Sequence, residues 1–412
     1  MTACSSGCTT GGGTASAITV TARDASNNPI QGLTVVLSAS GSGGNFTAPT
    51  TTNASGVSTS TFTSTSAEAK TISATISGVG ITQTASVTVN PAAVSAGQST
   101  VGAAPTSITA CNASCTTGGG TGSLITVTAK DQFGNVIQGA TVTLGSNGAN
   151  NNFTAPGTTN SSGVATSTFS SSTAESKTIS ATINAVAITQ KPTVTVNPAA
   201  VSAAQSTVTA GQSTMTACLT SCTTGGGTAS LITVTAKDAF GNAIPGATVV
   251  LSSTGSNNSF TAPGSTNSVG VATSTFTSTK AESKTVSATI NSAGITQTAS
   301  VTVNPAAASH LTFTVDPSNT PAGNDITPPV EVTALDQFNN VATGFTGEVV
   351  MAIGNDGSGG SGVLTYTAPV NASAGVATFS DLKITPSGNG YTLVASATGL
   401  TSATSPGFNI TP

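Results

Sequence analysis

Six cysteines are the residues of this chain whose type and spacing could support chemistry. They form three pairs, each with three residues between the partners, and none is left over: Cys4 with Cys8, Cys111 with Cys115, and Cys218 with Cys222. Such local pairs predict one disulfide bond per pair in an oxidising compartment. Reduced thiols and a metal site are the alternatives, although a metal needs three or four converging ligands and each pair supplies two.

Each cysteine pair lies in a longer stretch that recurs along the chain. The third copy begins MTACLTSCTTGGGTASLITVTAKD, and similar stretches begin at Met1 and Ile108. The step from Cys4 to Cys111 and the step from Cys111 to Cys218 are both 107 residues. This period predicts a tandem array of domains. We expect four domains, with the first strand of the first one truncated: residues 1–91, 92–198, 199–305 and a diverged domain at 306–412.

The strands that must position the cysteines are visible in the third copy. Residues 231–237 (LITVTAK) alternate apolar and polar side chains, a period typical of a half-buried strand. Asp238 to Asn242 predicts a turn whose Asp and Asn side chains bond nearby backbone amides. No stretch has a helical period, so we expect an all-β fold of four Greek-key sandwiches. The other expected strands are a broken one at 205–217 and four more at 248–252, 270–276, 284–290 and 298–303.

The composition excludes several classes of protein. Only 5% of the 412 residues are charged, there is no tryptophan, and the net charge is −4. Nine basic residues and an acidic balance disfavour a nucleic-acid partner, because lysine and arginine must neutralise its phosphates. No apolar run approaches the ~20 residues of a membrane-spanning helix. We therefore expect neither nucleic-acid binding nor membrane insertion.

The third copy also resembles a known family. Its segments SLITVTAKDAFGNAIPGATVVLS, GVATSTFTST and KTVSATINSAGITQTASVTVNP are similar to the bacterial immunoglobulin-like domains that form the rods of invasin- and intimin-type surface proteins. The resemblance covers nearly all of the first three copies, and residues 306–412 resemble a related variant. It implies an extended, extracellular, non-enzymatic rod and identifies no ligand. The Cys-x-x-x-Cys loop departs from the family pattern.

The remaining polar residues predict no catalytic or cofactor site. The single histidine, His310, has no neighbouring nucleophile motif, and the glycine triplets lack the Lys-Ser/Thr of a phosphate-binding loop. We expect no enzyme activity, no cofactor and no metal. Three Glu-x-Lys pairs are expected to be exposed ion pairs: Glu68 with Lys70, Glu175 with Lys177, and Glu282 with Lys284.

Calcium between domains needs six to eight oxygen ligands, usually with several carboxylates. The segments that join the first three copies contain no Asp or Glu, so we expect no acidic residue and no calcium at those junctions. In the fourth domain, Asp316, Asp325 and Asp336 leave a calcium site open.

The function expected is that of an extracellular structural protein, either a rod or the subunit of a surface filament. The first copy lacks the counterpart of residues 205–214, which predicts an unpaired strand edge completed by another chain or by a longer parent chain. The partners expected are head-to-tail copies or the continuation of a longer chain.

The alternative is an adhesin stalk whose fourth domain binds a host or surface ligand. Eight basic and six acidic residues give residues 1–305 a charge of +2, whereas one lysine and seven acids give residues 306–412 a charge of −6. Tyr366 and Tyr391 are the aromatic candidates for that contact.

Overall fold

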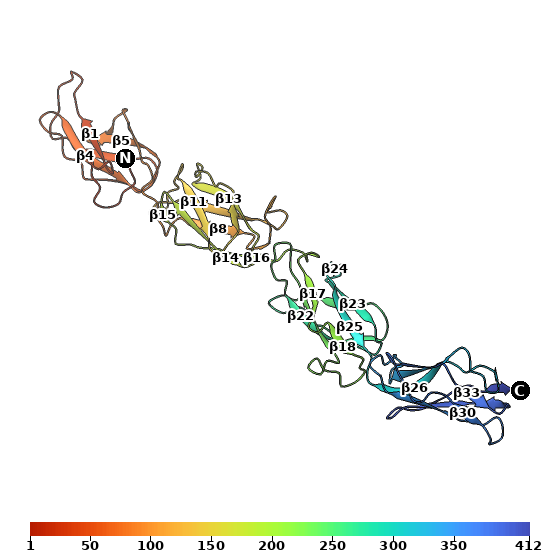
Figure 1. The fold of residues 1–412 in the computed structure, drawn as a ribbon. Coiled ribbons are helices and arrows are strands. Elements are labelled where there is room, and N and C mark those ends of the chain that lie inside the picture. The colour runs from red at the N-terminus through yellow and green to blue at the C-terminus, as the bar shows by residue number, and fades with distance from the viewer. The chain divides into compact units, whose positions relative to one another are not determined.

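The computed structural model describes all 412 residues and contains strands, turns and loops without any helix (Figure 1). It has 37 strands, β1 to β37. With no helix present, the structure has none that could cross a membrane. The expected all-β class is confirmed. The chain divides into two compact units, Met1–Ala199 and Ala200–Pro412, which are described separately.

The first unit begins with strands β1 to β7, which we call the first repeat. One sheet has the order β1-β4-β3, and in the other β5 pairs with β2, β6 and β7. β1 pairs with β4 alone, antiparallel, so its other edge carries no strand. The bounds are β1 Ser16–Thr21, β2 Val35–Ala39, β3 Gly44–Phe46, β4 Val57–Ser64, β5 Ala69–Ile76, β6 Val79–Gly80 and β7 Ala85–Thr88.

The second repeat, β8 to β16, completes the first unit. Its first sheet has one strand more than the corresponding sheet of the first repeat. That sheet has the order β12-β13-β10-β8, and the facing sheet has β11-β14-β16-β9 with β15 beside β14. β8 lies antiparallel to β10 with Val101 opposite Val127. The bounds are β8 Thr100–Ala104, β9 Ser107–Thr109, β10 Ser123–Thr128, β11 Val142–Ser146, β12 Asn151–Phe153, β13 Val164–Ser171, β14 Ser176–Ile183, β15 Val186–Ala187 and β16 Thr193–Asn197.

The third repeat, β17 to β25, opens the second unit and has the same two sheets, β17-β19-β22-β21 and β18-β25-β23-β20, with β24 beside β23. The broken first strand is confirmed, because β17 and β18 join different sheets. The other expected strands are also present, and the two strands not expected, the three-residue β21 and the two-residue β24, are too short to show a period. The bounds are β17 Thr207–Ala210, β18 Thr214–Thr216, β19 Ser230–Thr235, β20 Val249–Ser253, β21 Asn258–Phe260, β22 Val271–Ser278, β23 Ser283–Ile290, β24 Ala293–Gly294 and β25 Ala299–Asn304.

The C-terminal region, β26 to β37, has its own sheets, β26-β28-β32, β27-β37-β34, β31-β29-β35-β36 and β30-β33. The bounds are β26 Ala308–Val315, β27 Thr320–Pro321, β28 Val330–Asp336, β29 Glu348–Ile353, β30 Val363–Thr365, β31 Val370–Asn371, β32 Val376–Phe379, β33 Lys383–Thr385, β34 Gly388–Tyr391, β35 Leu393–Ser396, β36 Ala403–Thr404 and β37 Phe408–Thr411.

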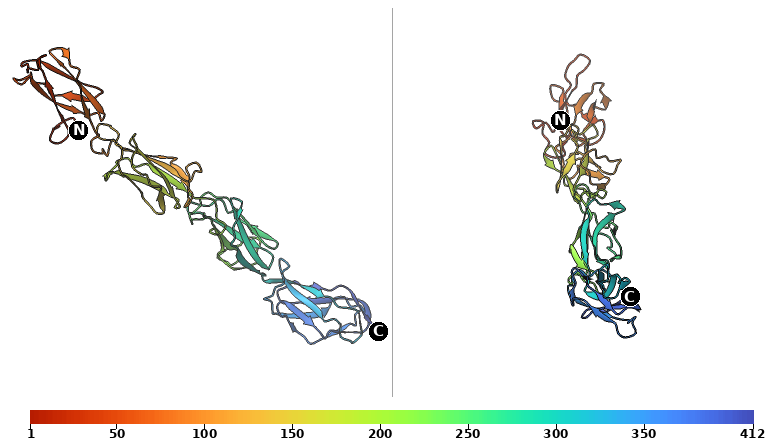
Figure 2. Two further views of the ribbon diagram at one scale, coloured as in Figure 1. Left: turned by 90° about the horizontal axis from the view of Figure 1, so that it is seen from above. Right: turned by 45° about the vertical axis from the view of Figure 1, so that its right-hand side comes forward.

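The strands of each repeat form two facing sheets (Figure 2). Their alternating apolar side chains are buried between these sheets. The second repeat has one continuous cluster of buried side chains, and so does the third. In the first repeat the corresponding residues separate into two clusters, one around Phe62 and a smaller one around Val20. Each buried valine, isoleucine or phenylalanine contributes about 1.5–3 kcal/mol, so the buried apolar core is the main stabilising feature of each sandwich.

Candidate functional site

The cysteine loops are turns tied to the edge of a sheet. The two sulfur atoms of each pair are bonded in the structure, and no free cysteine is present. In the third repeat the loop lies between β18 and β19, and the Cys218 amide donates to the Ser278 carbonyl at 3.0 Å. The loop brings no acid, base or basic side chain beside the sulfur atoms, so its geometry supports a structural role.

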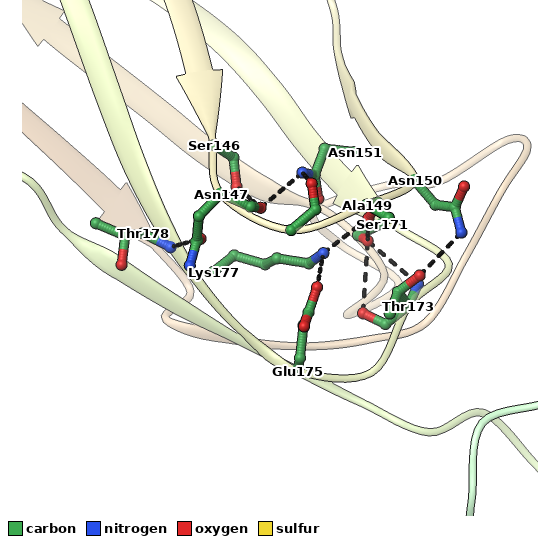
Figure 3. Close-up of polar contacts among 11 residues, drawn as sticks. Ser146, Asn147, Ala149, Asn150, Asn151, Ser171, Thr173, Glu175, Lys177 and Thr178 are labelled. Carbon is green, nitrogen blue, oxygen red and sulfur yellow. Dashed lines mark hydrogen bonds and ion pairs between the residues drawn. The ribbon is translucent and has the colours of Figure 1, made fainter.

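Each of the three Glu-x-Lys pairs contains a lysine whose side chain is buried. In the second repeat the Lys177 side chain is fully buried, and its Nζ donates to Glu175 Oε1 at 2.5 Å and to the Ala149 carbonyl at 2.8 Å (Figure 3). Glu175 keeps 42% of its side chain exposed. The hydrogen bond from Lys177 lowers the pKa of the Glu175 carboxyl. Equivalent contacts join Lys70 to Glu68 and Ser42, and Lys284 to Glu282 and Ser256.

The expectation of exposed ion pairs is therefore wrong for the lysines. Lys177 lies on the inward face of β14, in alternation with the buried Ile179 and Ile183. The two-residue spacing between Lys177 and Ile179 is visible in the sequence, and it is the signal from which the inward position of the lysine can be predicted. The buried ammonium bridges β14 to the loop before β12, which makes the pair a clamp within one domain.

A turn in the second repeat contacts the first repeat. The local bonds expected from the aspartate of the equivalent turn at 238–242 are present in both turns. The Phe240 and Asn242 amides donate to Asp238 Oδ1 at 2.9 Å, and the Phe133 and Asn135 amides donate to Asp131 Oδ1 at 2.9 Å. The other carboxylate oxygen, Oδ2, accepts the Asn135 side-chain amide at 2.7 Å and the backbone amide of Ala92 at 2.9 Å. Ala92 belongs to the segment that joins the two repeats, so Asp131 fixes that segment to the turn.

Asn135 and Phe133 extend this turn to the first repeat itself. The Asn135 Nδ2 donates to the Thr65 carbonyl at 2.8 Å, and its Oδ1 accepts the Ala67 amide at 3.0 Å. Phe133 packs against the buried cluster around Phe62. The expectation that this junction holds no acidic residue is wrong, because the fully buried Asp131 reaches it from the neighbouring domain rather than from the joining segment.

The second unit repeats this arrangement between the third repeat and the C-terminal region. Asn340 donates to the Thr279 carbonyl at 2.8 Å and accepts the Ala281 amide at 3.0 Å, while Asp336 Oδ2 accepts the Ala306 amide at 2.8 Å. Burial alone would raise the pKa of Asp336, but hydrogen bonds led by those from Asn340 outweigh it and lower the pKa.

These contacts define what we call the inter-repeat turn, an Asp-x-Phe-x-Asn segment that includes Phe338 in the second unit. The pattern recurs at 131–135, 238–242 and 336–340, and this recurrence is the sequence signal for it. The residue pattern of this segment predicts only local bonds, because nothing along the chain shows which neighbouring domain a side chain will reach.

The structure brings no metal site together. No three His, Cys, Asp or Glu side chains converge on one point. Asp325 lies 3.5 Å from the Lys383 ammonium, and Asp336 belongs to the inter-repeat turn. The aspartates considered as calcium ligands in residues 306–412 therefore do not converge on one point. His310 makes an ordinary polar contact, its Nδ1 lying 2.8 Å from the Ser309 hydroxyl.

Of the two tyrosines proposed for ligand contact, Tyr391 lies within the C-terminal core and Tyr366 packs against it. Tyr391 is fully buried and its hydroxyl donates to the Pro386 carbonyl at 3.0 Å. Tyr366 packs edge-on against Phe379, and its hydroxyl donates to the Met351 carbonyl at 3.1 Å. The expectation that a ring faces a ligand is wrong for Tyr391, which is a core residue, whereas Tyr366 is partly buried against the core and its role in ligand contact stays a prediction.

Sequence comparison places these sandwiches in a family. Residues 1–90, 105–197 and 212–304 each match the bacterial Ig-like domain (group 1). The chain belongs to this family. The resemblance seen in the sequence is thus confirmed, and the repeats are tandem bacterial immunoglobulin-like domains. No curated protein sequence matches the chain significantly.

Several solved structures are similar to this chain. FdeC, an Escherichia coli adhesin, is 26% identical over 71% of this chain and 92% of its own, with a TM-score of 0.45. Invasin, a bacterial integrin-binding protein, is 18% identical over 98% of this chain and 77% of its own, with a TM-score of 0.48. InvD of Yersinia pseudotuberculosis is 19% identical over 75% of this chain and 96% of its own, with a TM-score of 0.42.

Proposed function

We propose that this chain is a structural stalk segment, or the subunit of a surface filament, outside a bacterial cell. The inter-repeat turn is the observation that carries the proposal. One turn joins neighbouring domains through two side-chain-to-backbone hydrogen bonds, a bonded joining segment and a packed phenylalanine. Contacts of this kind resist bending at the junction, which is the property that a stalk needs and that an enzyme site does not use.

The proposal includes four domains, residues 1–91, 92–198, 199–305 and 306–412, arranged as an extended rod. The short joining segments support this arrangement, because few residues separate the last strand of one repeat from the first bonded residue of the next. The bonded cysteine pairs support an oxidising, extracellular location. Longer rods would form head to tail, by strand donation between molecules or by continuation of the chain.

A ligand-binding role for residues 306–412 is a second proposal with weaker support. Its remaining basis is the charge of −6, which comes from seven acids and one lysine. An acidic surface could attract a basic partner, but the fully buried Tyr391 supplies no aromatic contact, and Tyr366 is partly buried against the core.

Small-angle X-ray scattering of the full chain tests the stalk proposal. We expect an extended, stiff particle, and we expect the combined Phe133→Ala and Asn135→Ala substitutions to increase bending because they remove the contacts to the first repeat. The matched control is Asn28→Ala, which changes the equivalent asparagine of the first repeat. Far-UV circular dichroism should remain unchanged for all three proteins.

A compact particle, or a wild-type chain that already bends as freely as the double variant, would contradict the stalk proposal. Equal bending in the Asn28→Ala control would show that the inter-repeat turn is not the stiffening element.

A further inference from the structure

In the second and third repeats, the chain begins with a strand that is divided between both sheets, and we call it the opening strand. In the second repeat its first half, β8, pairs antiparallel with β10, and its second half, β9, pairs parallel with β16. In the third repeat β17 pairs antiparallel with β19, and β18 pairs parallel with β25. Since β16 and β25 are the last strands of their repeats, the two ends of each repeat meet in one parallel pair.

The parallel direction of this pair decides how a repeat responds to tension. The chain enters each repeat at the start of the opening strand and leaves it at the end of the last strand. Because the two strands run in the same direction, these two points lie at opposite ends of the pair. A pull on them slides one strand along the other and loads the hydrogen bonds between them together. An antiparallel pair would have both points at one end, and its bonds would break one after another.

Backbone hydrogen bonds extend the parallel pair beyond its three paired positions. In the second repeat the Thr195 amide donates to the Thr106 carbonyl, and the Ala110 amide donates to the Asn197 carbonyl, both at 2.8 Å. The equivalent bonds of the third repeat, also at 2.8 Å, run from Thr302 to Ser213 and from Ala217 to Asn304. The two repeats therefore share the same backbone connection between their opening and last strands.

An asparagine side chain fastens the parallel pair in the second repeat. Asn197, at the end of β16, donates from Nδ2 to the Ser107 hydroxyl at 2.8 Å and to the Ile108 carbonyl at 3.3 Å. Both partners belong to β9, so this side chain lies across the two strands that tension would slide apart. The equivalent Asn304 of the third repeat makes no side-chain hydrogen bond.

A buried serine fastens the opening strand in the third repeat, at the point where it crosses from one sheet to the other. The Ser230 hydroxyl donates to the Gln212 carbonyl at 2.7 Å and accepts the Gln212 amide at 3.2 Å. Gln212 lies between β17 and β18, so Ser230 holds both backbone groups of the crossing residue. The second repeat has Pro105 at this position, which has no amide hydrogen, and the equivalent buried Ser123 hydroxyl has no hydrogen-bond partner.

We propose that the opening and last strands of the second and of the third repeat form a clamp that carries tension along the chain. Asn197 strengthens the clamp of the second repeat by joining the strands that slide, and Ser230 strengthens that of the third by holding the crossing. Unfolding under force is governed by the unfolding rate, so bonds that must break first determine the resistance. The inference deepens the proposed stalk function and rests on it, because a stalk transmits force between its ends.

Single-molecule force spectroscopy of the full chain, held at its two ends, tests the clamp. At constant force we expect Asn197→Ala and Ser230→Ala each to speed the unfolding of one repeat about fivefold, the factor that corresponds to the loss of one hydrogen bond. The matched variants Asn304→Ala and Ser123→Ala should unfold at the wild-type rate, because neither side chain has a hydrogen bond to lose.

A further variant separates the clamp from general stability. Ser274 is also a buried serine of the third repeat, and its hydroxyl donates to the Thr261 carbonyl at 2.6 Å, away from the opening and last strands. In chemical denaturation, Ser274→Ala and Ser230→Ala should lower the stability of the third repeat by similar amounts. Under force, only Ser230→Ala should speed its unfolding.

Equal acceleration by Ser274→Ala and Ser230→Ala under force would overturn the clamp, because the effect would then follow the loss of stability alone. Wild-type unfolding rates for both Asn197→Ala and Ser230→Ala would overturn it as well. Neither outcome affects the scattering test of the inter-repeat turn. A compact or freely bending particle would contradict the stalk and would leave the unfolding rates of the single repeats unchanged, so the two failures are distinguishable.

Discussion

The first and second repeats have nearly the same strands but differently closed cores. Ile18 and Val20 on β1 correspond to Ile125 and Val127 on β10, and the sheet register with the next strand is the same. The second repeat adds β8, and Val101 then joins both halves of its core. The comparison shows that a sandwich of this type depends on a strand from the joining segment, so each domain is completed by the residues that connect it to its neighbour.

The largest effect is expected from opening the second repeat. Val101→Asp places an unpaired carboxylate in a fully buried position and should destabilise that repeat by about 3–5 kcal/mol. Differential scanning calorimetry should show its unfolding transition move to lower temperature. Leu124→Asp is the control, because Leu124 is 42% exposed in the same sheet. Equal losses in both variants would mean that Val101 has no special part in closing the core.

The reciprocal change should close the first repeat. A second copy of residues 92–107, fused directly before Met1, should stabilise the first repeat by about 2 kcal/mol, the value expected for burying one valine. Chemical denaturation followed by residue-resolved exchange would measure the gain in β1. The same extension with lysine at the valine position should give none. An equal gain in stability with the lysine extension would mean that the added chain length, and not the buried valine, stabilises the first repeat. That result would contradict the role that the comparison assigns to the valine.

The smallest effect is expected for the pH dependence of stability, and it concerns the Glu-x-Lys pair that the first and second repeats share. The hydrogen bond from the adjacent lysine lowers the pKa of Glu68 and of Glu175 below the ordinary value of 4.5. A lowered pKa means that each pair stabilises the fold above pH 4.5 and that this contribution is lost as the pH falls through the folded pKa. Carboxyl-carbon NMR should give similar lowered values for both residues.

The variant Glu175→Gln should remove the second repeat's share of this acid sensitivity and leave that of the first. A Glu68 pKa at the ordinary value beside a lowered Glu175 pKa would show that the divided core of the first repeat also loosens the clamp around Lys70.

Much of the architecture could be predicted from local patterns. The two-residue alternation of strands such as 231–237 and the local cysteine pairs depend on residues close together in the chain. The 107-residue period is a repetition of the sequence itself. All three features are therefore visible in the sequence. The buried lysines were missed although their spacing from Ile179 pointed inward, because lysine is rarely buried without a partner and the partner carbonyl lies in another strand's loop.

The site was harder to predict than the fold, for a physical reason. The sequence determined that Asp131 and Asn135 form a turn and that the strands repeat. Only the tertiary structure decided that Asn135 bonds the preceding domain and that Val101 joins two halves of a core. Contacts of this kind depend on which surfaces meet after folding, and neither residue type nor spacing along the chain specifies that meeting.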